Sequence, residues 1–256
     1  MDVEAVRALR HSAVQGDAAA LAALEAQAAA GNLEALWCLG SLYDVMQTAA
    51  IPVDLKRAHD YYLQAAEGGH AMAQFCLANL LDLGEGGAPD LVGARRWYLA
   101  AAEQDVRDAQ MHVARMMQSG RGGPVDLHGA VEWYGRAVSQ GDPLAATNLA
   151  LIYLNHTNTQ NFEAIHELLD FAADKLDGLA HFLLGELTRT GRGTDRDPEL
   201  ALLHYCTATL LLPPGDNQRA SVQRMEALLA PDPSVRPEIE RRARGYIERR
   251  GGRLPS

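Results

Sequence analysis

The same dozen residues occur twice in the chain, as ARRWYLAAAEQD at 94–105 and as AVEWYGRAVSQG at 130–141. In both copies an alanine leads, a large aromatic pair follows three and four residues later, and a pair with small side chains follows seven and eight residues later. These offsets place side chains on one face of an α-helix. The copies lie 36 residues apart, and a repeat of this period indicates stacked helical units.

Further copies of this helix begin at Ala58, Ala201 and, more weakly, Ala164. A second pattern precedes each copy: an alanine, then a large apolar residue four positions on and a small one five positions on. It begins at Ala35, Ala73, Ala109, Ala145 and Ala180. Turns, mostly rich in glycine, separate the two patterns, and most end in an aspartate that can cap the next helix, at Asp54, Asp90, Asp126 and Asp197. Each unit is therefore predicted to be helix, loop, helix.

ALWCLGSLYD at 35–44, GEGGAPDLVGARRWYLAAAEQD at 84–105 and GRGGPVDLHGAVEWYGRAVSQGD at 120–142 resemble the Sel-one-like repeat, a relative of the tetratricopeptide repeat. The resemblance implies an all-α fold, a right-handed α/α superhelical solenoid of about five two-helix repeats with helical caps. The unit at 141–175 departs most, since it lacks the glycine loop and the aromatic pair. The expected boundaries are a degenerate cap at 1–30, repeats at 31–68, 69–104, 105–140, 141–175 and 176–212, and a second cap with a basic tail at 213–256.

Net charge, apolar runs and cysteine content limit the classes of function and the location that we expect. The net charge of −10 argues against broad nucleic-acid binding, which needs a basic face. No apolar run approaches the length of a membrane span, and the first twenty residues do not resemble a signal peptide. Three widely spaced cysteines do not form a disulfide framework, so we expect free thiols at Cys38 and Cys76 and a reducing, cytoplasmic location.

No catalytic motif is recognisable, whether a phosphate-binding GxxxxGK, a GxSxG nucleophile turn or an HExxH metal site. We therefore predict a protein that is not an enzyme, with no cofactor and no metal, in which His112 and His204 pack between helices. The alternative is an enzyme or a regulatory subunit that uses the polar segment Asn155–Phe162, where His156 is the acid–base candidate.

In the related superhelices the first helix of each unit lines a concave surface, and the resemblance implies the same here. With the leading alanine facing the neighbouring helices, positions three, six and ten residues later face away. We call these residues the candidate surface. They mix amide, hydroxyl, cationic and apolar side chains, which suits an extended peptide. They are Cys38, Ser41, Val45, Cys76, Asn79, Leu83, His112, Arg115, Ser119, Asn148, Leu151, Asn155, Leu183, Glu186 and Thr190.

The resulting hypothesis is a non-catalytic scaffold or adaptor that binds a protein or peptide partner, as many bacterial relatives do. A second hypothesis is an immunity protein that occludes a secreted effector with the same surface. A third is a structural domain that only oligomerises, through the basic edge Arg241–Arg250. The sequence leaves the partner, the organism and the oligomeric state open.

Overall fold

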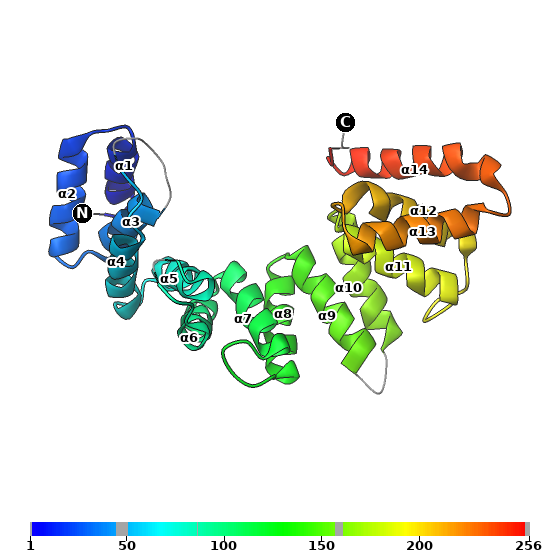
Figure 1. Cartoon of the computed structure of the whole chain (residues 1–256), viewed down its shortest axis with the longest axis horizontal. Coiled ribbons are helices and arrows are strands. Elements are labelled where there is room, and N and C mark those ends of the chain that lie inside the picture. The colour runs from blue at the N-terminus through cyan, green and yellow to red at the C-terminus, as the bar shows by residue number, and fades with distance from the viewer. Residues whose placement is uncertain (1, 45–50, 86, 157–160, 254–256) are drawn as a thin grey trace. The chain divides into compact units, whose positions relative to one another are not determined.

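The computed structural model describes residues 2–44, 51–85, 87–156 and 161–253. Within these ranges the chain forms fourteen α-helices and one short 3-10 helix, with no β-strand (Figure 1). The all-α prediction is confirmed. None of the described helices has the length and apolar content needed to cross a membrane.

The chain divides into two compact units, Met1–Trp133 and Tyr134–Ser256, with the boundary inside helix α8. The helices of the first unit are α1 Val3–Val14, α2 Ala18–Ala29, α3 Leu33–Asp44, α4 Leu55–Glu67, α5 Ala71–Leu83, α6 Leu91–Ala102, α7 Arg107–Ser119 and the start of α8 Leu127–Ser139. The second unit continues with α9 Pro143–His156, α10 Phe162–Asp174, α11 Gly178–Thr190, α12 Pro198–Leu211, α13 Asp216–Leu229, the 3-10 helix Pro233–Val235 and α14 Arg236–Arg249.

Within each unit, consecutive helices pack against each other. In the first unit α3 packs on α4 and α5 on α6, and in the second unit α9 packs on α10 and α11 on α12. The pair α9–α10 forms although its sequence departs from the repeat pattern. Helix pairs stacked in this order give a repeat fold in which each pair buries the apolar face of its neighbour.

The packing face predicted from the alanine and aromatic positions is the buried one. Tyr62, Tyr98, Tyr134 and Tyr205, the second members of the large pairs, are essentially inaccessible, as are their leading alanines. The small residue of the preceding helix makes room for each ring. A Cβ atom added to Gly40 would lie 2.5 Å from Cδ1 of Tyr62, and one added to Gly185 would lie 2.8 Å from Cε1 of Tyr205. The repeated small residue therefore lets the two helices of a unit approach each other closely.

The turn residues also act as predicted. Asp54, Asp90 and Asp197 each accept a hydrogen bond from a backbone N–H in the first turn of the following helix. Gly84 ends α5 and Gly191 ends α11 with left-handed φ angles of 71°. A side chain would be strained in that conformation, which accounts for glycine at both positions.

Candidate functional site

The part of the candidate surface on α3 is closed. Cys38 is 0% exposed and Ser41 is also buried, because α1 packs against α3. Arg10 Nε donates a hydrogen bond to Ser41 Oγ over 2.7 Å, and Arg7 Nε pairs with Glu34 Oε1 over 2.7 Å. The expectation that Cys38 and Ser41 face a partner is therefore wrong, since the N-terminal cap occupies that face. Val45 lies outside the described residues.

The part on α5 and α7 is open. Leu83 is 65% exposed, Arg115 and Ser119 are exposed, and Cys76, Asn79 and His112 are half-buried. Two of these residues contact Tyr98 of α6. The Tyr98 hydroxyl donates to Asn79 Oδ1 over 2.5 Å, and the His112 ring stacks on the Tyr98 ring with 4.7 Å between centroids. Tyr98, which packs between the helices, thus also holds Asn79 and His112 of the candidate surface in place.

Arg115 completes this group by donating from Nη2 to His112 Nδ1 over 3.1 Å. Burial lowers the pKa of His112, and the nearby Arg115 lowers it further. The imidazole is therefore neutral at pH 7, with Nδ1 accepting and its hydrogen on Nε2. Ser119 donates to the backbone carbonyl of Arg115, and Arg115 itself is exposed to solvent.

In the second unit, a groove of about 250 Å³ lies between α9 and α11. Five predicted residues line it together: Leu151, Asn155, Leu183, Glu186 and Thr190. Sequence reasoning missed Leu154, Leu187 and Arg192, which complete the lining. The remaining predicted residue of α9, Asn148, is half-buried and donates from its amide nitrogen to the Leu144 carbonyl on its own helix. Its leucines are buried or half-buried, whereas Asn155, Thr190 and Arg192 are exposed, so the groove has an apolar floor and a polar rim.

Glu186 is held by the fold. Its carboxylate accepts hydrogen bonds from the Tyr205 hydroxyl over 2.7 Å, from Arg189 over 2.8 Å and from Arg224 of α13 over 2.8 Å. Burial alone would raise the pKa of Glu186, but these hydrogen bonds outweigh burial and lower it. Glu186 is thus a charged residue fully engaged within the protein. The spacing of three residues to Arg189 was the one signal in the sequence for this contact.

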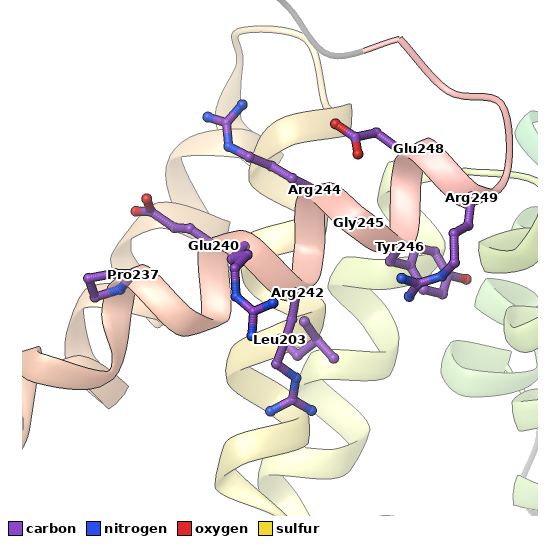
Figure 2. A pocket seen from close by; sticks show the side chains of 10 residues that line it. Leu203, Pro237, Glu240, Arg242, Arg244, Gly245, Tyr246, Glu248 and Arg249 are labelled. Carbon is purple, nitrogen blue, oxygen red and sulfur yellow. The ribbon is translucent and has the colours of Figure 1, made fainter.

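The basic helix α14 carries a groove of about 750 Å³, which is lined by α14 itself and by Leu203 of α12 (Figure 2). Carboxylates already engage several arginines within and just after α14: Arg241 pairs with Glu238, Arg242 with Glu199 and Arg250 with Asp174. Figure 2 shows that Arg242 and Arg244 leave the helix in opposite directions, so these cations do not converge on one anion.

In the C-terminal cap, Ile239 is buried against α12 and α13, whereas Val235 is 38% exposed. In the described part of the chain, no group of three or more His, Cys, Asp or Glu side chains is placed to hold a metal ion. Of the polar segment Asn155–Phe162, residues 157–160 lie outside the described ranges.

Comparison with known families adds to this geometry. A Sel1 repeat family model matches residues 34–70, 71–106, 107–142 and 178–211, which together make up more than half of the chain. The chain belongs to the Sel1 repeat family. The Sel1 model does not match the segment that contains α9 and α10, although these helices pair like those of the matched repeats.

Solved Sel1 repeat structures share the fold. A Sel1 repeat protein from Oxalobacter formigenes is 25% identical, with a TM-score of 0.75 over 90% of this chain and 100% of that one. A protective antigen from uropathogenic Escherichia coli strains, with an SLR fold, is 22% identical, with a TM-score of 0.70 over 96% of this chain and 61% of that one. Comparison with the curated proteins finds no match. Sel1 repeat proteins generally mediate contacts between proteins.

Proposed function

We propose that this chain is a non-catalytic interaction module whose open parts of the candidate surface, one in each unit, bind extended segments of a protein partner. The observation that carries the proposal is the groove between α9 and α11, because five residues chosen for one face of the first helices line it together. An apolar floor with a polar rim can seat a side chain and hydrogen-bond the backbone of a bound segment.

The open part on α5 and α7 supports the same proposal. It presents an exposed leucine, an exposed arginine and an ordered amide, and arginine is enriched among the residues that carry most of the binding energy at protein interfaces. The three cysteines are free thiols, which supports our expectation of a cytoplasmic location.

Affinity capture with a double variant tests the proposal. Arg115→Glu changes an exposed side chain of α7, and Asn148→Ala changes a half-buried side chain of α9, the helix that carries the groove residues Leu151 and Asn155. We expect the variant to keep the circular dichroism spectrum of the wild type and to capture less of the natural partner. A matched control is Arg96→Glu with Gln140→Ala, which places the same changes on exposed positions of second helices or their ends.

Capture that is equal for the wild type and the double variant would refute the proposed surface. An immunity protein that occludes an effector would use the same residues, and the identity of the captured partner separates an effector from an ordinary client.

A further inference from the structure

The part of the candidate surface on α5 and α7 offers hydrogen-bond donors almost without acceptors. Asn79 has its carbonyl oxygen occupied by the Tyr98 hydroxyl at 2.5 Å. Its amide nitrogen, which carries two hydrogens, is therefore the part of the side chain left to bind something else.

His112 and Arg115 add to this bias. His112 Nδ1 accepts from Arg115, so the neutral ring carries its hydrogen on Nε2 and presents a donor there. Arg115 uses one donor in this contact and keeps the other guanidinium hydrogens. The Asp82 carboxylate is paired with Arg121 over 2.8 Å and is nearly inaccessible, so its ion-pair partner is Arg121 and not Arg115.

These donors are close together because a chain of contacts links them to the Tyr98 ring. Asn79 bonds the Tyr98 hydroxyl, His112 stacks on the Tyr98 ring, and Arg115 bonds His112. Phe75 meets both rings as well, with its centroid 5.9 Å from that of Tyr98 and 5.8 Å from that of His112. The packing of four side chains therefore fixes the positions of the donors before any partner arrives.

In the second unit, the tyrosine equivalent to Tyr98 is Tyr205, and its hydroxyl bonds a carboxylate instead of an amide. Glu186 stands six residues after its leading alanine, as Asn79 does, and it accepts from Tyr205, Arg189 and Arg224. In that unit the chain supplies its own carboxylate to the tyrosine and the arginines. On α5 and α7 the tyrosine bonds an amide, and Arg115 has no carboxylate partner among the described residues.

We propose that the α5–α7 surface binds the side-chain carboxylate of an aspartate or glutamate in an extended segment of the partner. The carboxylate accepts from the Asn79 amide and from Arg115, and Leu83 contacts the apolar residues beside it. Hydrogen bonds from a cation to a carboxylate are about twice as strong as neutral ones, so this contact favours acidic segments over their amide counterparts. This inference rests on the proposed function and specifies its partner.

NMR titration with two short capped peptides tests the inference. The peptides are identical, with serine and leucine as background, except that one carries two aspartates where the other carries two asparagines. We expect the acidic peptide to shift the Asn79 side-chain amide and the Arg115 Nε–H signals and to bind about tenfold more tightly than the asparagine peptide.

Variants localise the effect. Arg115→Gln removes the charge, and we expect it to abolish the preference for the acidic peptide. Asn79→Asp keeps an acceptor for Tyr98 but replaces the donors with negative charge, and we expect it to repel that peptide. The matched control is Arg107→Gln, which removes the same charge from an exposed position on α7, and we expect it to keep the preference.

Equal binding of the two peptides, no binding of either at millimolar concentration, or an unchanged preference in Arg115→Gln would each overturn the inference. Such a result would leave the proposed function standing if the double variant Arg115→Glu, Asn148→Ala still lost the natural partner. Conversely, a preference for the acidic peptide together with undiminished capture by that double variant would uphold the donor site and refute the proposed function.

Discussion

The Nδ1 atoms of His181 in α11 and His204 in α12 lie 3.1 Å apart, so one of these imidazoles donates a hydrogen and the other accepts it. His181 is 2% exposed, and the Tyr246 ring of α14 meets it edge-on at 5.1 Å between centroids. Two protonated imidazoles could not keep this contact, because each Nδ1 would then carry a hydrogen. The interface between α11, α12 and α14 is therefore stable only while His181 and His204 are not both protonated.

Acid should destabilise the packing of α11, α12 and α14. Burial lowers the pKa of His181 to about 3, assisted by His204, and burial lowers the pKa of His204 to about 4, assisted by His166. Both values lie below the unfolded value of 6.5, so the stabilisation is complete above pH 6.5 and is lost as the pH falls toward 4. Each histidine should lower the free energy of unfolding by about 2 kcal/mol between pH 7 and pH 5.

Hydrogen exchange of α11, α12 and α14 at these two pH values, corrected for the intrinsic rate, measures the loss. His204→Asn cannot titrate but can still hydrogen-bond, and it should show a smaller pH dependence. If wild type and variant lose protection equally, the histidine pair does not set the acid sensitivity.

The glycine that faces each buried tyrosine should be sensitive to one methyl group. Gly40→Ala and Gly185→Ala place a Cβ atom 2.5 Å and 2.8 Å from a tyrosine ring, so we expect each to destabilise the fold by about 1–3 kcal/mol. Gly135→Ala in α8 is the control, because nothing lies within 4 Å of its added Cβ, and we expect it to stabilise the fold by up to about 1 kcal/mol. Urea denaturation of the three variants checks this. Destabilisation by Gly135→Ala alone would contradict the packing account.

The helical pattern predicted the repeat fold because its spacing records which side chains meet inside one helix pair. Ala94 and Tyr98 could be assigned to the seam in this way, since both contacts are local to a unit. The burial of Cys38 could not, because it depends on α1, whose own sequence is an alanine-rich cap with no repeat signature. Contacts that join distant segments, such as Arg224 with Glu186, leave no periodic trace either.

Thiol labelling tests the closed part of the candidate surface. Burial raises the pKa of both thiols, that of Cys38 to about 11, but Cys38 is also 0% exposed under α1, so we expect it to react with maleimide far more slowly than the half-buried Cys76. Mass spectrometry of the two labelled peptides gives both rates. Arg10→Ala removes the hydrogen bond to Ser41 and should speed the labelling of Cys38 while leaving Cys76 unchanged.

Labelling of Cys38 at the rate of an exposed thiol would show that α1 does not close this face. The first repeat would then return to the surface available to a partner.

Site-specific photo-crosslinking in cells tests the central claim most directly, namely that a partner binds along the first helices. A benzophenone amino acid at Leu83 on α5 or at Val92 on α6 probes the two kinds of helix at matched exposure, 65% and 69%. We predict a discrete protein adduct from position 83 that Arg115→Glu diminishes, and none from position 92. Adducts from position 92 alone, or equal adducts from both, would contradict the account.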